Sequence, residues 1–271
     1  MTRGEFFCGN QGIKKQCFKF EGQFPVIFRH CRRRNMQLQT RNLTKQYGDK
    51  TAVNHLNLIL TNGIYGLLGA NGAGKTTFMR LLCGLQKPTE GEIRLDGKSV
   101  SQMGAAYTEL LGYLPQQFPY YPDFTAEDFL LYMAAVKGLN QNEARKKSRE
   151  LLAAVGLEKR GKEKIRRFSG GMKQRLGIAQ ALLNDPKILI FDEPTAGLDP
   201  KERIRFRNLL HSFAENKIVL LSTHIVSDVE STADTILIMK NGKIVYTGRT
   251  EMMTDDLEKL YLYYFGEEEE S

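Results

Sequence analysis

The chain has 271 residues, of which 41% are hydrophobic and 26% charged, an ordinary globular composition that is large enough to bury a core. The formal net charge is +8, but residues 1–35 hold eight Lys and Arg against two acidic residues and carry +6 of it. The remaining residues carry only +2 and show no basic stripe with interleaved aromatic residues, so we expect no nucleic-acid partner. No apolar run approaches the roughly 18–20 residues that span a bilayer.

Residues 1–35 form a basic leader that lacks the periodicity of the rest of the chain. One interpretation is a disordered tail. The other is a non-native upstream extension, with Met36 as the true start, because Arg32 to Arg34 could be encoded by AGG-type codons that resemble a ribosome-binding site. The four cysteines, three of them in this leader, have neither disulfide nor zinc-ligand spacing, which fits a reducing cytosol.

The part of the chain after the leader is predicted to begin with strands. Two strands, at 37–44 and 51–60, are joined by a turn at Gly48-Asp49, and shorter strands are expected at 63–68, 92–95 and 111–114. One helix is expected at 75–84, with Gly84 ending it.

Residues 116–183 contain no predicted strand, and apolar spacing indicates helices at 126–137, 142–155 and 170–183. Beyond them, the continuous apolar runs at 188–191 and 218–221 are typical of parallel strands that are buried on both faces. The predicted elements that complete the chain are helices at 202–214 and 226–233, a hairpin of strands 236–239 and 243–247, a helix at 256–265 and an acidic tail at 267–270.

A phosphate-binding pattern, G-x-x-x-x-G-K-[ST], lies between the strand at 63–68 and the helix that follows. Backbone N–H groups of such a loop converge on phosphate oxygens, the lysine neutralises the β- and γ-phosphates, and the next hydroxyl ligates Mg²⁺. The alternative is a glycine turn that merely caps a helix. The predicted ATP-binding residues here are Gly69, Ala70, Asn71, Gly72, Ala73, Gly74, Lys75, Thr76 and Thr77, with Thr76 also binding Mg²⁺.

Two further segments carry candidate chemistry. The apolar strand at 188–191 is followed by Asp192, predicted to hold Mg²⁺, and by Glu193, predicted to polarise the attacking water, although the strand could simply end in a polar turn. Ser169 is a good N-cap, and the glycines at 170 and 171 expose backbone donors at the start of a helix. This segment is interpreted as a second anion-binding site. The alternative is a capped helix that binds no ligand.

Together these motifs resemble the ATP-binding cassette (ABC) family of transport ATPases over residues 36 to about 248. The resemblance implies an α/β fold. In such a fold, a P-loop NTPase core with a mixed, mainly parallel sheet would carry an N-terminal antiparallel β subdomain and an inserted helical subdomain, here expected at about 116–183, with a C-terminal helix and acidic tail expected at 249–271. It also implies that Ser169, Gly170 and Gly171 form the signature motif, which reaches the γ-phosphate held by a partner subunit. The chain has Phe-Ser-Gly-Gly-Met where Leu-Ser-Gly-Gly-Gln is commonest.

The resemblance assigns four more positions. Tyr47 is similar to the aromatic residue that stacks on adenine, and Gln116 to the glutamine that senses Mg²⁺ and the γ-phosphate, with Gln117 as the competing choice. Asp199 is similar to the residue that contacts the other subunit, and His224 to the switch histidine that helps Glu193.

The implied function is that of an ATP-hydrolysing subunit, most similar to bacterial exporter cassettes, that pairs with a second ATPase subunit and drives a separate membrane permease. Such a subunit is cytoplasmic and peripheral on the inner face of the membrane. The aromatic-rich stretch 113–129 is either its permease-docking surface or ordinary core. The alternative function is a soluble ABC ATPase in a non-transport process.

Overall fold

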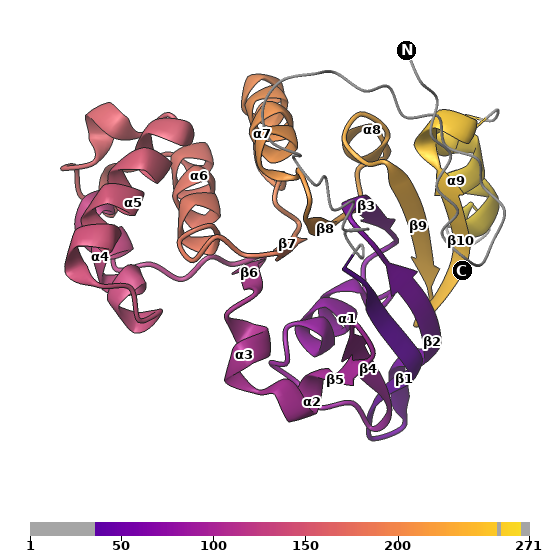
Figure 1. Cartoon of the computed structure of the whole chain (residues 1–271). Helices are drawn as coiled ribbons and strands as arrows, with labels where there is room; N and C mark the ends of the chain where they lie inside the picture. The colour runs from indigo at the N-terminus through magenta and orange to yellow at the C-terminus, as the bar shows by residue number, and fades with distance from the viewer. Residues whose placement is uncertain (1–35, 254–255, 267–271) are drawn as a thin grey trace, which may run out of the picture. The chain divides into compact units, whose positions relative to one another are not determined.

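The computed structural model describes residues 36–253 and 256–266, in which two sheets are surrounded by helices (Figure 1). The predictions for the leader and for the acidic tail at 267–270 lie outside these residues. Sheet A is antiparallel and has the order β2-β1-β4-β5, with β2 at Lys50–Leu60, β1 at Leu38–Tyr47, β4 at Glu90–Leu95 and β5 at Lys98–Ser99.

Sheet B has the order β10-β9-β3-β8-β7-β6 and is parallel except for the edge pair β9–β10. This confirms the predicted mixed, mainly parallel sheet. Its strands are β10 (Lys243–Arg249), β9 (Thr235–Lys240), β3 (Gly63–Leu68), β8 (Ile218–Thr223), β7 (Ile188–Asp192) and β6 (Leu111–Leu114).

Alternate residues of the central strands enter two separate cores, as expected for strands covered on both faces. Ile190 of β7 and Leu220 of β8 pack on the side of sheet A and α1 (Lys75–Leu82), whereas Phe191 and Leu221 pack on the opposite side. On that side lie α7 (Pro200–Phe213), α8 (Val226–Glu230) and α9 (Leu257–Phe265).

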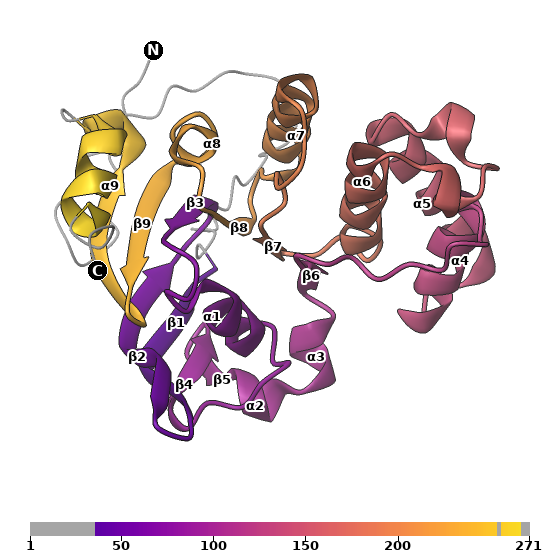
Figure 2. The same ribbon diagram turned by 180° about the vertical axis from the view of Figure 1, so that it is seen from behind.

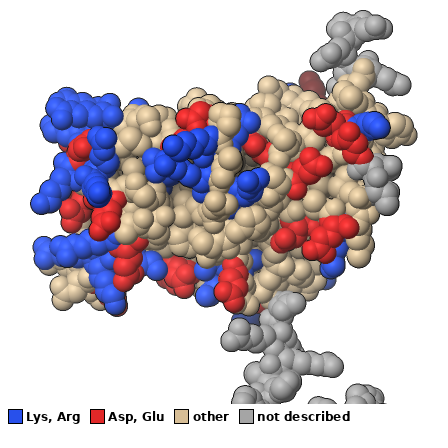
Figure 3. Space-filling model, turned by 90° about the horizontal axis from the view of Figure 1, so that it is seen from above, with Lys and Arg blue, Asp and Glu red and all other residues tan. Residues whose placement is uncertain are grey.

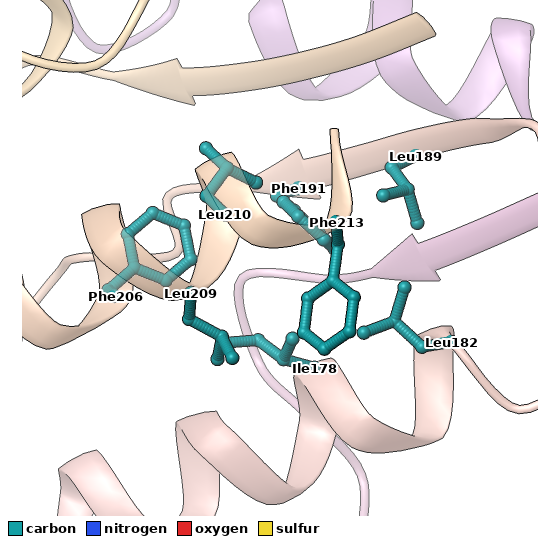
Figure 4. Close-up of a pocket in the computed structure, with 8 residues that line it drawn as sticks. All are labelled: Ile178, Leu182, Leu189, Phe191, Phe206, Leu209, Leu210 and Phe213. Atoms are coloured by element: carbon teal, nitrogen blue, oxygen red, sulfur yellow. The ribbon is translucent and has the colours of Figure 1, made fainter. Parts of the chain in front are cut away.

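The helical block consists of α4 (Ala126–Val136), α5 (Gln141–Ala154) and α6 (Gly170–Ala181), and both views show these helices together beyond β6 and β7 (Figures 1 and 2). Short 3-10 turns at Glu158–Arg160 and Ile165–Arg167 link α5 to α6. A small apolar pocket joins the block to the core (Figure 4), and its lining residues are Ile178 and Leu182 of α6, Leu189 and Phe191 of β7, and Phe206, Leu209, Leu210 and Phe213 of α7.

Several predicted bounds differ from the structure. The sequence did not predict β5, α2 (Val100–Met103) or α3 (Ala105–Thr108), although the last is fixed by the buried Tyr107, whose hydroxyl donates to the Leu82 carbonyl at 2.7 Å. The helix expected at 202–214 begins at Pro200, since Asp199 caps it and proline suits the first helical position. Among the described helices none has the length and apolarity to cross a bilayer.

Candidate functional site

The phosphate-loop pattern leads from the carboxyl end of β3 into α1, as predicted. Gly72 and Gly74 have φ of 83° and 107°, a left-handed region that favours glycine, and a Cβ at Gly74 would meet the Ala52 carbonyl. The loop is tied to the β9–β10 turn by a 2.9 Å hydrogen bond from the Gly242 N–H to the Ala73 carbonyl. The α1 N-terminus therefore lies beyond the carboxyl end of β3, a central strand of sheet B, with backbone donors and the helix dipole available to an anion.

Lys75 is buried at the start of α1. Its Nζ donates to the carbonyls of Gly69 at 2.6 Å and Ala70 at 3.1 Å, and lies 4.0 Å from Glu193 Oε1. Burial lowers the pKa of the Lys75 ammonium, and the carboxylates of Glu193 and Asp192 oppose that shift. An ammonium held at this position can donate to anionic phosphate oxygens in place of the neutral carbonyl oxygens.

The two carboxylates that follow β7 are held by the neighbouring strand β8. The Ser222 hydroxyl donates to Asp192 Oδ1 at 2.7 Å. Ser222 Oγ also accepts a hydrogen bond from the Glu193 N–H at 3.0 Å. The other Asp192 oxygen, Oδ2, is buried and has no hydrogen-bond partner within the described part of the chain. A buried, unsatisfied carboxylate oxygen is costly unless a donor or a cation meets it, and hard oxygen is the donor that Mg²⁺ prefers.

Glu193 is where the predicted site residues converge. Its backbone has φ of 48°, uncommon outside glycine, and its side chain is almost fully buried. Its Oε2 accepts from Gln116 Nε2 at 3.2 Å, while Oε1 lies 3.4 Å from Nδ1 of His224. Gln116 and His224 are both more exposed than Glu193, so they connect the buried carboxylate with the surface. For Gln117 the described residues show no such contact.

The predicted signature and the Asp199 loop both begin helices. Ser169 caps α6 by accepting the Met172 N–H at 3.2 Å, and Asp199 caps α7 by accepting the Glu202 N–H at 2.8 Å. No hydrogen bond or ion pair in the described ranges joins Ser169 or Asp199 to Lys75 or Glu193. The chain by itself thus assembles the phosphate loop, Asp192, Glu193, Gln116 and His224, and leaves the other two segments apart.

Tyr47 lies at the end of β1 and is 44% exposed. Its hydroxyl donates to Gln86 Oε1 at 2.6 Å, and Lys45 Nζ lies 5.2 Å from the centre of its ring. An exposed ring is available for stacking, but these contacts also suit an ordinary strand-end tyrosine, so adenine stacking stays a prediction.

The sequence analysis missed Ser222 and Asp228. Ser222 stands two residues before His224 at the end of a buried apolar strand, a position that could have indicated its role. Asp228 of α8 accepts from the Thr195 hydroxyl at 2.6 Å and lies 3.7 Å from Arg203, so it ties the loop after Glu193 to α7. Neither contact follows from chain spacing, because each joins different elements.

The fold and this site define the class: an α/β ATP-binding cassette with a phosphate loop and a buried carboxylate pair. The family model for ABC transporters matches residues 53–196. The chain is 42% identical to the bacitracin transport ATP-binding protein BcrA of Bacillus licheniformis, over 77% of this chain and 68% of that protein. It is 39% identical to the Nod factor export ATP-binding protein I of Burkholderia orbicola, over 77% and 69%.

Among solved structures, it resembles a dimeric ATP-binding cassette in a post-hydrolysis state bound to ADP and Pi, with a TM-score of 0.71 and 28% identity. That match covers 79% of this chain and 98% of the solved one. The chain therefore belongs to the ABC transporter family, as one of its ATP-binding, ATP-hydrolysing cassettes.

Ser222→Ala tests whether β8 positions the two carboxylates. Removing the hydroxyl leaves Asp192 Oδ1 and the Glu193 N–H without their buried partner, a loss worth about 1–3 kcal/mol. We expect the ATPase rate to fall on the order of tenfold or more, measured as phosphate release, with a smaller change in ATP affinity. Ser212→Ala, which removes an exposed hydroxyl on α7, is the matched control. An unchanged rate for Ser222→Ala would show that the serine does not position the carboxylates.

Proposed function

We propose that this cassette hydrolyses ATP between two subunits and drives export through a separate membrane permease. The observation that carries the proposal is the buried Glu193 carboxylate, contacted by Gln116, His224 and Lys75. A buried carboxylate beside a phosphate loop can accept a proton from water, and its two exposed partners give it contact with whatever occupies the loop.

Phosphate binding falls to the loop and to Lys75. We expect the ammonium to exchange the carbonyls of Gly69 and Ala70 for β- and γ-phosphate oxygens, since a bond between a cationic donor and an anionic acceptor is stronger than a bond from the same donor to a neutral carbonyl. The donor set also fits Mg²⁺, which would neutralise phosphate charge: Asp192 offers a buried, unsatisfied oxygen, and Thr76 and Gln116 offer neutral oxygens. Tyr47 is the proposed adenine contact.

A second subunit completes the site in this proposal. The starts of α6 and α7 are exposed at Ser169, Gly170 and Asp199. In the described residues, no hydrogen bond joins them to the phosphate loop of the same chain. The dimeric solved relative supports a pairing in which each subunit offers Ser169 to Gly171 to the nucleotide of the other. The second subunit is another copy or a homologue. Gln116 and His224 would then report the γ-phosphate to the helical block.

The permease contact is proposed for one part of the aromatic-rich stretch 113–129. Phe129 is buried and belongs to the core, and Phe118 packs against it with ring centres 5.5 Å apart. In contrast, Tyr121 is 48% exposed and meets Tyr132 of α4, just beyond the stretch and 44% exposed, edge to face at 5.6 Å, with Phe124 beside them. Exposed aromatic clusters are typical of protein contact surfaces, so this trio is the proposed docking point.

The positive charge of the helical block supports a location at a membrane surface. Residues 137–175 hold 13 Lys and Arg against four acidic residues, and these cations gather at the left end of Figure 3, over the helical block. The inner leaflet of a bacterial membrane is anionic and attracts cationic surfaces. The proposed location is therefore the cytoplasmic side, peripheral on the inner face of the membrane.

Glu193→Gln tests the catalytic assignment. Because an amide cannot take a proton from water but preserves shape, we expect ATP binding to remain, turnover to fall on the order of a hundredfold or more, and an ATP-bound dimer to accumulate. Light scattering after size-exclusion chromatography detects the dimer, and phosphate release gives the rate.

Two variants frame this experiment. Lys75→Ala should lose ATP binding itself, while Glu230→Gln, an exposed carboxylate on α8, should behave as the parent. Near-normal ATPase in Glu193→Gln would reject Glu193 as the base.

Co-purification from the native host tests the transport assignment. We expect the tagged chain to recover an integral membrane protein, and to lose it when Tyr121 and Tyr132 are both changed to Ser, because the docking surface would lose its aromatic area. Mass spectrometry identifies the partner. Recovery of ribosomal or DNA-bound proteins in its place would favour the non-transport alternative.

A further inference from the structure

The second turn of α6 and the first turn of α7 are joined by an ion pair between Arg175 and Glu202. Arg175 Nε lies 3.4 Å from Glu202 Oε2, and the two side chains are only 14% and 19% exposed. Because this pair is largely removed from water, it is screened less than a surface pair. It links the helical block to the ATPase core through α6 and α7, the two helices that also line the apolar pocket of Figure 4.

Each partner is also fixed on its own side. Arg175 donates from NH1 to the Val155 carbonyl at 3.1 Å and from Nε to the Gly171 carbonyl at 3.4 Å, so its guanidinium is fastened within the helical block. Glu202 Oε1 accepts from Arg205 at 3.1 Å. Its Oε2 is buried and makes no hydrogen bond in the described residues, so the guanidinium of Arg175 is the charge that compensates it.

The two helices also approach closely at Gly171. A Cβ built on that glycine would lie 3.2 Å from Cγ, Cδ and Oε2 of Glu202, closer than side chains normally pack. Gly170, by contrast, has no atom within 4 Å of such a Cβ. A side chain at the second glycine of the predicted signature would therefore have to displace the Glu202 side chain by a few tenths of an ångström.

The ends joined in this way are the two segments proposed to reach a second subunit. Ser169 caps α6 and Asp199 caps α7, and the Arg175–Glu202 pair lies within the first two turns of both helices. A surface made of two independently moving segments would have to be ordered when a partner binds, and that ordering weakens association. An ion pair that already orders the two segments in the free subunit lowers the entropic cost of association.

We propose that Arg175 and Glu202 are positioning residues that hold the signature and the Asp199 loop as one preformed surface for the second subunit. This inference rests on the proposed two-subunit site. It assigns the pair to assembly of the dimer, and it leaves ATP binding by the phosphate loop of the same chain unaffected.

The test uses full-length chain carrying Glu193→Gln, which holds the ATP-bound dimer. Glu202→Gln keeps the shape and removes the charge, and Arg175→Lys keeps the charge but cannot hold both Val155 and Glu202. Analytical ultracentrifugation in ATP should show a dimer Kd raised about tenfold in each variant. Binding of a fluorescent ATP analogue at low protein concentration should be unchanged. Arg205→Gln, which removes the other partner of Glu202, is the matched control and should leave the dimer Kd as in the parent.

The double variant separates positioning from general damage to the fold. If the two residues act through each other, Glu202→Gln with Arg175→Lys should raise the dimer Kd no further than either change alone. An unchanged Kd in Glu202→Gln, an additive double variant, or an equal effect of Arg205→Gln would overturn the proposal. If the parent forms no ATP-dependent dimer, the two-subunit site itself is wrong, and the proposal is rejected with it.

Discussion

A buried carboxylate needs partners that the fold must bring to it, and Glu193 is the carboxylate that the predicted site residues Lys75, Gln116 and His224 contact. Strands β7 and β8 are parallel neighbours, so Ser222 reaches both the Glu193 N–H and Asp192 from the next strand. The positive φ of Glu193 turns its side chain out of the strand alternation, and Lys75, Gln116 and His224 meet it there. The order of sheet B therefore decides which residues can take part in the chemistry.

The same arrangement is the basis for the proposed two-subunit site. The phosphate loop follows β3 and Glu193 follows β7, the two parallel strands on either side of β8, so both lie at the carboxyl ends of the strands, where α/β proteins bind their ligands. Ser169 and Asp199 begin helices whose exposed N-termini do not contact that loop. In the proposed dimer, these two helix N-termini would face the nucleotide held by the other subunit. The Arg175–Glu202 ion pair connects the two helices, and so connects the helical block to the core.

The sequence predicted the main elements and the local motifs well, because they depend on short-range patterns. The apolar runs of β7 and β8 and the loop before Lys75 are examples. The misses arose where tertiary contacts decide. The helix expected to reach 233 ends at Glu230, since Asp234 is held by Ile64 of β3 through its N–H at 2.8 Å and its Oδ2 at 2.7 Å. Ser222, Asp228 and the Arg175–Glu202 pair were missed for the same reason: each acts across elements distant in sequence.

Complementation between two inactive variants tests most directly whether a second subunit completes the ATP site. Lys75→Ala removes the lysine of the phosphate loop, and with it the expected ATP binding, but keeps the proposed signature. Gly170→Asp keeps the loop and places a carboxylate at the signature, where open space tolerates the side chain. Each variant alone should lack ATPase activity, and mixing them should restore it, because one site of the mixed dimer combines an intact loop with an intact signature. Activity of Gly170→Asp alone, or none in the mixture, would contradict a shared site.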